Sequence, residues 1–314
     1  MSKSIAIIFP GQGSQSVGML AELAAAWPQV GETFAEASEA LGLDLWQVTS
    51  QGPKDLLDRT DITQPAMLAA GVAVWRVWNQ AGGPAPAWMA GHSLGEFTAL
   101  VCAGALGFAD AVALVAQRGR FMQEAVPAGA GAMAAILGLA DDQVVAVCAQ
   151  AAEGGILEPV NFNSPGQVVI AGEAAAVARG IAAAKAAGAK RAVLLPVSVP
   201  SHCALMRPAA ERLAVALAAI PLAAPRIPVL HNITVDAVAD PAAIRERLVR
   251  QLYSPVRWVE TVRCLADQGV GLLLEAGPGK VLTGLTKRID DRLEALAVLD
   301  PKGLALALEA TNHA

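Results

Sequence analysis

The residues best suited to chemistry form a glycine-flanked segment, GHSLG, at residues 91 to 95. This segment directly follows a candidate strand and directly precedes the helical pattern EFTALVCAG. A serine hydroxyl is a poor nucleophile, but a tight strand-to-helix turn holds it near backbone N–H donors and the positive end of the helix. An ordinary glycine-rich turn with a capping serine fits this context less well. Ser93 is therefore the predicted nucleophile.

A nucleophilic serine needs a base to accept its proton, and four histidines are candidates: His92, His202, His231 and His313. His92 is adjacent to Ser93 on a turn, so its side chain should point elsewhere. His313 lies in a terminal segment that we expect to fray. His231 lies within an apolar strand pattern, where a buried histidine with satisfied hydrogen bonds is the commoner outcome. His202 follows a proline-bounded strand end and is slightly favoured, but the residues alone leave His202 and His231 both open.

Two further glycine-bearing turns follow candidate strands, PGQGSQ at 10 to 15 and GPGK at 277 to 280. Ligands of open α/β sheets gather at the carboxyl ends of the strands, so a backbone N–H of the first turn could help to bind an oxyanion. Neither turn completes a nucleotide-binding motif, because Ser16 replaces the third glycine in the first and Val281 replaces the serine or threonine in the second. Both are predicted to be structural turns that face a site.

One arginine lies where a charge is unexpected. The segment from residue 108 to 125 predicts an amphipathic helix, and at about 100° per residue Arg118 falls about 60° from the centre of its apolar face. A guanidinium there is costly unless an anion meets it, and its fork suits a carboxylate. A protein carboxylate, escape of the side chain to the surface, or a substrate carboxylate would each resolve the cost. Beside Ser93, a substrate carboxylate would select a donor such as a malonyl thioester. The predicted face comprises Phe108, Ala111, Val112, Val115, Gly119 and Met122.

The elements that must position these residues follow an α/β pattern. Short β-branched runs alternate with longer alanine-rich helical patterns, which predicts parallel strands covered by helices. From Gly131 the order is strand, helix, strand, strand, helix, strand, which is the ferredoxin-like order. We expect a hydrolase-like parallel sheet with helices on both faces, formed by residues 1–127 and 198–314, and an inserted ferredoxin-like α+β subdomain at 128–197. The candidate strands of the large sheet are residues 4–10, 85–91, 226–234, 271–277 and 295–300.

Composition excludes several classes of function. The net charge is −5 and the basic residues are scattered, so no footprint for nucleic acid or an anionic membrane is present. No apolar run approaches the roughly 20 residues of a membrane helix, and the amino-terminal segment has no export signal. The cysteines lack metal-type spacing, so we interpret them as reduced thiols of a cytoplasmic protein with no metal site. A monomer is the default expectation. The four cysteines are Cys102, Cys148, Cys203 and Cys264.

The ordered motifs of the chain resemble a known family. They are GQGSQ at 11–15, TQPA at 63–66, GHSLGE at 91–96, QR at 117–118, VNFNSPGQ at 160–167, PVSVPSHCALM at 196–206, QLYSPVRW at 251–258 and EAGPGKVL at 275–282. Together they are similar to the malonyl-CoA:acyl carrier protein transacylases of the FabD type, over about residues 5 to 290. The serine motif alone is a weak signal, whereas the ordered set is highly specific.

The resemblance implies an acyltransferase of fatty acid biosynthesis with two partners, malonyl-CoA and acyl carrier protein. A malonyl group would be carried on Ser93, with His202 as general acid and base and Arg118 as the ligand of the malonyl carboxylate. The coenzyme A thioester is then a substrate, and no cofactor is implied.

The resemblance also implies supporting roles for backbone groups. The N–H groups of Gln12 and Leu94 would meet the oxyanion, and the carbonyl of Gln251 would hold the imidazole of His202 in place of an acidic residue. In related polyketide acyltransferase domains, a bulky aromatic before this histidine favours malonyl over methylmalonyl. Ser201 occupies that position here, so selectivity against an α-methyl group stays open.

Other functions fit the sequence less well. A serine esterase or thioesterase of the α/β type would carry an acidic residue between the serine and a late histidine, whereas His202 lies mid-chain. A docking module without activity would have a broken serine–histidine pair. A polyketide-pathway acyltransferase would share the chemistry and differ in its carrier protein. The sequence therefore favours an acyl-carrier-protein S-malonyltransferase.

Overall fold

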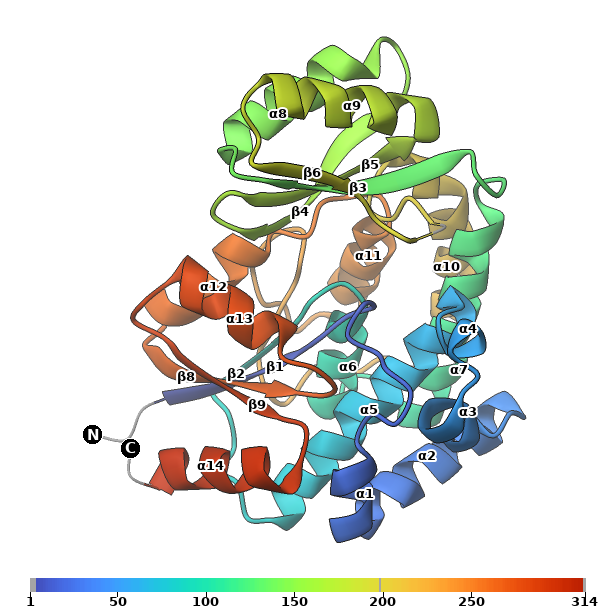
Figure 1. The fold of residues 1–314 in the computed structure, drawn as a ribbon. Coiled ribbons are helices and arrows are strands. Elements are labelled where there is room, and N and C mark those ends of the chain that lie inside the picture. Colours follow the sequence, from blue (N-terminus) through green and yellow to red (C-terminus); the bar gives the residue numbers. More distant parts are fainter. Residues whose placement is uncertain (1–3, 198, 313–314) are drawn as a thin grey trace.

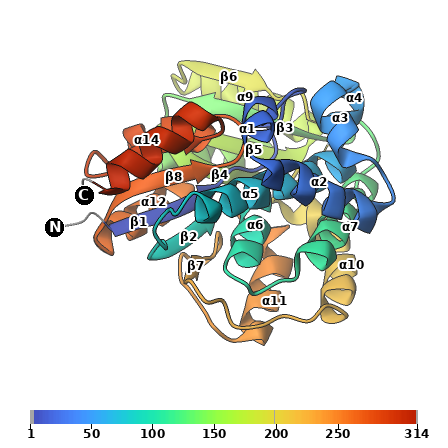
Figure 2. The same ribbon diagram turned by 90° about the horizontal axis from the view of Figure 1, so that it is seen from below.

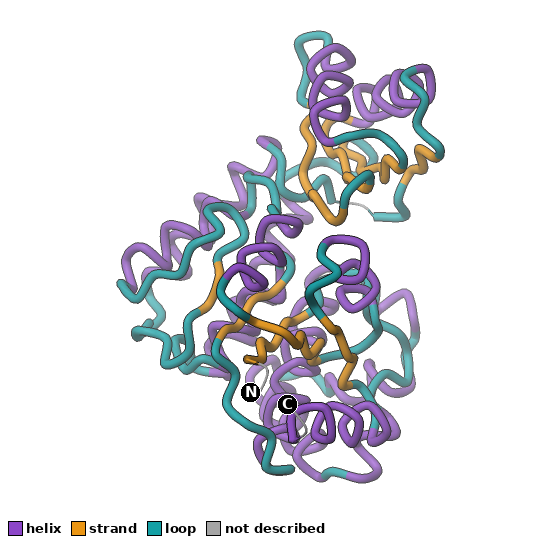
Figure 3. The backbone as a smooth tube through the Cα atoms, turned by 90° about the vertical axis from the view of Figure 1, so that its left-hand side faces the viewer, coloured by secondary structure: helices purple, strands orange, loops and turns teal. Residues whose placement is uncertain are grey.

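The structure is a computed structural model that describes residues 4–197 and 199–312 (Figure 1). His313, one of the four histidines considered above, lies outside the described residues. The strands form two separate groups, one in a larger α/β part and one in a smaller α+β part (Figure 3). The predicted fold class, a parallel sheet with helices plus an inserted ferredoxin-like unit, is confirmed.

The large sheet has five parallel strands in the order β7-β2-β1-β8-β9. They are β1 (Ser4–Phe9), β2 (Trp88–Gly91), β7 (Val229–Leu230), β8 (Val270–Ala276) and β9 (Glu294–Val298). All five predicted strands are present, but β7 is much shorter than the segment 226–234 predicted for it. The chain leaves the sheet after Leu230, because the carbonyl of His231 accepts a hydrogen bond from the N–H of Val235 in a turn.

Helices cover both faces of this sheet (Figure 2). Strand β1 is apolar throughout, as expected for a parallel strand buried on both sides. Its residues Ile5, Ile7 and Phe9 pack toward one layer of helices, and Ala6 and Ile8 pack toward the opposite layer. The layer that contacts Phe9 includes α2 (Pro28–Leu41), α5 (Thr60–Gln80), α6 (Leu94–Cys102), α7 (Phe108–Glu124), α10 (Arg207–Ala218), α11 (Pro241–Gln251) and α14 (Pro301–Asn312). The other layer comprises α12 (Trp258–Asp267) and α13 (Val281–Ile289).

The small part has an antiparallel sheet in the order β4-β5-β3-β6, which is the ferredoxin-like strand order. Helices α8 and α9 cover one face. Hydrogen bonds from Phe162 N to Val256 O and from Val256 N to Val160 O tie β4 to the large part. The elements lie within the predicted segment 128–197, whose boundaries stay a prediction. They are β3 (Gly131–Leu137), α8 (Asp141–Ala152), β4 (Leu157–Ser164), β5 (Gln167–Glu173), α9 (Ala174–Ala186) and β6 (Arg191–Leu194).

The remaining elements are short. Helices α1 (Ala21–Ala26), α3 (Leu45–Gln51) and α4 (Lys54–Leu57) precede α5, and a 3₁₀ turn, η1 (Ala204–Met206), precedes α10. No helix within residues 4–197 and 199–312 is long and apolar enough to cross a membrane. All four cysteines are free thiols, as predicted. Burial raises the pKa of Cys148 and of Cys203 to about 12, so neither is a ready nucleophile.

Candidate active site

Ser93 lies on a strained turn between β2 and α6. Its φ of 51° and ψ of −108° lie in a region that residues other than glycine rarely adopt, and such strain is characteristic of functional turns. A Cβ on Gly91 would come within 1.9 Å of the carbonyl carbon of Gly95. A Cβ on Gly95 would come within 2.1 Å of the carbonyl oxygen of Phe9. Glycine is therefore required at both positions, because the backbones of β1, β2 and α6 approach so closely here that no Cβ atom fits between them.

The hydroxyl of Ser93 is hydrogen-bonded to a histidine. Oγ of Ser93 lies 2.8 Å from Nε2 of His202, and Nδ1 of His202 lies 2.8 Å from the backbone carbonyl oxygen of Gln251. A carbonyl can only accept, so Nδ1 carries the proton and Nε2 is left as the acceptor of the serine O–H. This arrangement is a serine–histidine dyad oriented by a carbonyl, and of the two histidines left open by the sequence it is His202 that is hydrogen-bonded to the hydroxyl.

The surroundings of His202 keep its imidazole neutral. The side chain is buried, and burial together with the nearby cation of Arg118 lowers its pKa to about 3. The hydrogen bond to the Gln251 carbonyl acts in the opposite direction but does not offset these effects. At neutral pH the ring therefore has a free lone pair to accept the proton of Ser93.

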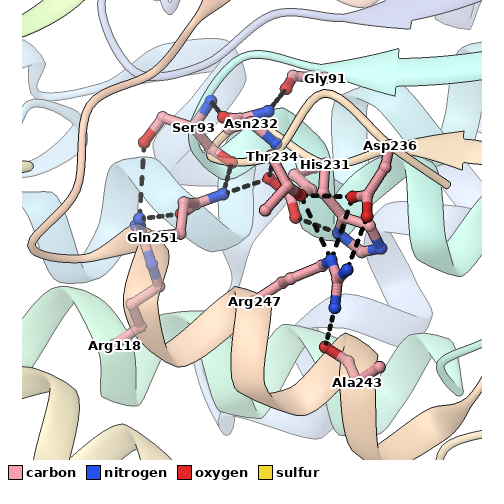
Figure 4. Close-up of polar contacts among 11 residues, drawn as sticks. Gly91, Ser93, Arg118, His231, Asn232, Thr234, Asp236, Ala243, Arg247 and Gln251 are labelled. Atoms are coloured by element: carbon pink, nitrogen blue, oxygen red, sulfur yellow. Dashed lines mark hydrogen bonds and ion pairs between the residues drawn. The ribbon is translucent and has the colours of Figure 1, made fainter. Parts of the chain in front are cut away.

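Arg118 is buried on α7 and points to the same hydroxyl (Figure 4). The apolar face predicted for this helix is buried as expected. Nη2 of Arg118 lies 3.4 Å from Oγ of Ser93, and it donates to Oε1 of Gln251 over 2.9 Å. Nη1 donates to Oε1 of Gln64 over 2.8 Å. Burial lowers the pKa of Arg118 to about 10, so the guanidinium still carries its charge at neutral pH.

The other two described histidines do not reach the hydroxyl of Ser93. Nε2 of His92 is hydrogen-bonded to Oδ1 of Asn163 over 2.8 Å, so its side chain diverges from the serine as predicted. His231 is fully buried behind the turn, where Nδ1 lies 2.7 Å from Oε1 of Glu96. Its burial is the outcome that the apolar strand pattern favoured, but the expected full set of hydrogen bonds is incomplete, because Nε2 is buried without a partner among the described residues.

A layer of polar side chains behind the turn was missed by the sequence prediction. Asn232 accepts a hydrogen bond from the backbone N–H of Ser93 and donates to the carbonyl of Gly91, each over 2.7 Å. Glu96 accepts from the backbone N–H of Asn232 over 3.0 Å and from Nε2 of Gln251 over 2.8 Å. The available signal was Glu96 itself, a charged residue within the otherwise apolar start of α6.

The dyad and the arginine line one cavity of about 130 Å³ between the two parts of the molecule. The large part contributes Ser93, His202, Arg118, Gln12 and Leu94, and the small part contributes Met133, Asn161, Leu195 and Val197. Leu94 is the first residue of α6, so its N–H has no partner within the helix and is available to a ligand. All six residues predicted for the site are thus close together, because Gln251 contacts both His202 and Arg118.

The GPGK turn is placed differently from PGQGSQ. Gln12 lines the cavity above Ser93, whereas Pro278 and Gly279 line a second cavity of about 300 Å³ beside Met19. A Cβ on Gly279 would lie 3.4 Å from Cβ of Ser14, so the two turns pack together. The GPGK turn therefore supports the first loop rather than facing the serine.

Comparison with known proteins assigns the family. Residues 6–295 match the model of the acyl transferase domain family. The malonyl CoA-acyl carrier protein transacylase of Salmonella typhimurium is 64% identical over 303 residues, which cover 96% of this chain and 98% of that protein. The chain belongs to this transacylase family. The Bacillus subtilis transacylase is 46% identical over 314 residues, which cover 100% of this chain and 98% of that protein.

Solved structures of the transacylase family share the whole fold. The FabD structure from Coxiella burnetii is 50% identical and aligns with a TM-score of 0.98, covering 100% of this chain and 99% of that one. A malonyl-transacylase solved in complex with a type II PKS acyl-carrier protein is 59% identical, with a TM-score of 0.96 over 98% of this chain and 99% of that one. Both parts of the present chain therefore have counterparts in the family.

Proposed function

We propose that this chain transfers a malonyl group from malonyl-CoA to the phosphopantetheine thiol of acyl carrier protein, through a malonyl ester on Ser93. One observation carries the proposal: the hydroxyl of Ser93 lies 2.8 Å from Nε2 of His202 and 3.4 Å from Nη2 of Arg118, inside one cavity. A base and a cation that can bind a carboxylate thus lie beside the same nucleophile. The relatives named above bear the name of this activity, and fatty acid biosynthesis is the corresponding pathway.

The first half-reaction forms the ester. Nε2 of His202 takes the proton of Ser93 as the oxygen attacks the thioester carbonyl, and a tetrahedral oxyanion forms. The backbone N–H groups of Gln12 and Leu94 donate to this oxyanion. The C–S bond then breaks, and the imidazolium returns the proton to the departing sulfur, so coenzyme A leaves as a thiol.

The second half-reaction repeats these steps with the carrier thiol as nucleophile. His202 takes the thiol proton, the sulfur attacks the ester carbonyl, and the proton returns to Ser93 as the C–O bond breaks. One thioester is exchanged for another, with no net change in oxidation state and no water consumed. Every step uses side chains and backbone groups of this chain, and the coenzyme A thioester is a substrate rather than a cofactor.

Arg118 binds the free carboxylate of the malonyl group. A buried cation with no acidic partner is costly, and a malonyl carboxylate removes that cost through charge-assisted hydrogen bonds. A neutral acyl group such as acetyl leaves the cation unpaired, which disfavours it in the cavity.

The test is to detect the intermediate. Brief incubation of the chain with malonyl-CoA, followed by mass spectrometry of the intact protein and of its peptides, is expected to show a malonyl adduct on Ser93. The adduct should persist without a carrier and disappear when holo-acyl carrier protein is added. Ser93→Ala is the control and should show no adduct. Rapid release of free malonate in the absence of a carrier would instead identify a serine hydrolase.

A polyketide pathway is the second candidate, because a relative that is 59% identical was solved with a type II PKS acyl-carrier protein. The chemistry at Ser93 is the same in both pathways. Competition between a fatty acid carrier and a polyketide carrier for malonyl transfer distinguishes them, and a higher kcat/KM with the fatty acid carrier is expected.

We further propose that the chain acts as a cytoplasmic monomer whose small subdomain spans residues 128–197. Support for the boundaries comes from the ferredoxin-like sheet, whose strands run from Gly131 to Leu194. Light scattering on the purified chain gives the oligomeric state, and expression of residues 128–197 alone tests the boundaries.

A further inference from the structure

The cation of Arg118 is held by two neutral amides rather than by an acid. Its two terminal nitrogens donate to Oε1 of Gln64 and to Oε1 of Gln251. Within the part of the chain that the structure describes, no carboxylate forms an ion pair with this guanidinium. An amide oxygen accepts a hydrogen bond without cancelling the charge, so the guanidinium keeps a positive charge that can attract an anion in the cavity.

The amide of Gln251 can adopt only one orientation. Nε2 donates to the carbonyl oxygen of Ser93 over 3.0 Å and to Oε2 of Glu96 over 2.8 Å. Neither of these oxygens can donate in return, so the NH₂ group must face them and Oε1 must face Arg118. The position of the guanidinium is thereby coupled to the backbone of the nucleophile itself.

Glu96 is a negative charge that is separated from Arg118 by the side chain of Gln251. Its carboxylate is buried and occupied by His231, by the N–H of Asn232 and by Gln251. The charge of Glu96 acts to raise the pKa of Arg118 against the larger effect of burial. The amide of Gln251 thus separates a buried acid from a buried cation, which prevents their direct pairing.

We propose that Gln64 and the side chain of Gln251 are specificity-determining residues, which select an anionic acyl group by holding Arg118 in place without neutralising it. The inference rests on the proposed function, because it assumes that a malonyl carboxylate meets Arg118. It assigns to Gln251 a second task, distinct from the support that its backbone carbonyl gives to His202. A carboxylate at position 64 would occupy the guanidinium and repel the carboxylate of the substrate.

The experiment compares kcat/KM for malonyl-CoA and for acetyl-CoA, with holo-acyl carrier protein as acceptor. Gln64→Glu is nearly isosteric and places a carboxylate against Arg118. The malonyl-to-acetyl ratio is expected to fall by about 100-fold, since like charges brought together in a buried site are strongly unfavourable. Gln80→Glu, the same substitution at an exposed position on the same helix, is the matched control and should keep the ratio within about twofold.

Two uncharged variants distinguish the effect of an added negative charge from the effect of losing a hydrogen-bond acceptor. Gln64→Met and Gln251→Met each remove one acceptor of Arg118 and add no charge. Each should lower the ratio by roughly tenfold, because the guanidinium is less firmly positioned. Gln251→Met also removes the donors to the carbonyl of Ser93 and to Glu96, so transfer from both donors should fall, and the malonyl-to-acetyl ratio rather than the absolute rate is the readout for this variant.

The outcomes separate this inference from the proposed function. If wild type forms the malonyl adduct on Ser93 and Gln64→Glu lowers the ratio, the inference is supported. If Gln64→Glu and both methionine variants lose activity equally for the two donors, the amides have only a structural role and the inference is wrong. If wild type forms no adduct, the proposed function itself fails. Should Gln64→Glu not fold, the two methionine variants decide through the same ratio.

Discussion

Two buried histidines lie near Ser93, and they differ in the group that holds the imidazole ring. His231 has a carboxylate partner, Glu96, whereas His202 has only the backbone carbonyl of Gln251. By the pattern of acid–histidine–serine triads, His231 would be the base. His202 is nevertheless the ring that reaches the hydroxyl, since its Nε2 faces Ser93 and its tautomer is fixed by the carbonyl. In the proposed mechanism the base is therefore oriented by a backbone carbonyl, and the buried acid lies beside the other histidine.

The difference also divides the surroundings of Ser93 into two sides. On the cavity side, His202 and Arg118 contact the hydroxyl and can meet a substrate. On the packed side, Glu96, His231 and Asn232 are buried and hold the backbone of the turn. Substitutions on the first side should cost activity, and substitutions on the second side should cost stability.

The largest expected effect is on the cavity side. His202→Ala removes the base and should lower kcat/KM for malonyl transfer by roughly 10³- to 10⁴-fold, with little change in the unfolding midpoint. His231→Ala, measured in the same assay, should lower kcat/KM by about tenfold or less among the molecules that remain folded. A larger loss in His231→Ala than in His202→Ala would reassign the base.

On the packed side the expected effect is on stability. Asn232→Ala removes two hydrogen bonds of the turn and leaves the N–H of Ser93 and the buried carbonyl of Gly91 without these partners. The free energy of unfolding should fall by about 3 kcal/mol, as measured by urea denaturation. Asn79→Ala is the matched control, because the side chain of Asn79 is exposed and donates to the carbonyl of Trp75 in its own helix, and it should change stability by less than about 0.5 kcal/mol. Equal losses in both variants would contradict the bracing role of Asn232.

The smallest expected effect is on pH dependence. His202 acts as a base only when neutral, and its pKa of about 3 lies below its ordinary value. The neutral form is therefore kept as pH falls through about 6.5, and it is lost only when pH reaches the lowered pKa. The rate of Ser93 malonylation at pH 5.5 should stay within about twofold of the rate at pH 7.5, as followed by rapid quenching and mass spectrometry. A midpoint near pH 6.5 would mean that His202 is more solvated than the structure shows.

The features that sequence reasoning predicted are mostly those set by local patterns. The glycine spacing around Ser93, the apolar face of α7 that carries Arg118, and the order of elements along the small subdomain can each be read from residues close in the chain. The short β7 was overestimated, because the turn after Leu230 depends on hydrogen bonds that an apolar run does not reveal.

The features that were missed depend on contacts between distant segments. Gln251 lies 133 residues from Arg118 and 155 residues from Glu96, and Asn232 lies 139 residues from Ser93. No spacing rule joins such positions. The resemblance to a known family predicted the role of the Gln251 carbonyl. It did not predict the contacts of the Gln251 side chain, since a glutamine in a helix has no distinctive pattern.

The cavity has a floor formed by the α/β part and a roof formed by the inserted ferredoxin-like part. Ser93, His202 and Arg118 form the floor on the α/β part, whereas Met133, Leu195 and Val197 of the inserted part form an apolar roof. The inserted part also brings one polar side chain to the cavity, Asn161 of β4, whose Oδ1 is buried without a hydrogen-bond partner in the part of the chain that the structure describes. Substitution of the three apolar residues can therefore enlarge the cavity for longer or branched acyl chains, while Asn161 and the residues that contact Ser93 are left unchanged.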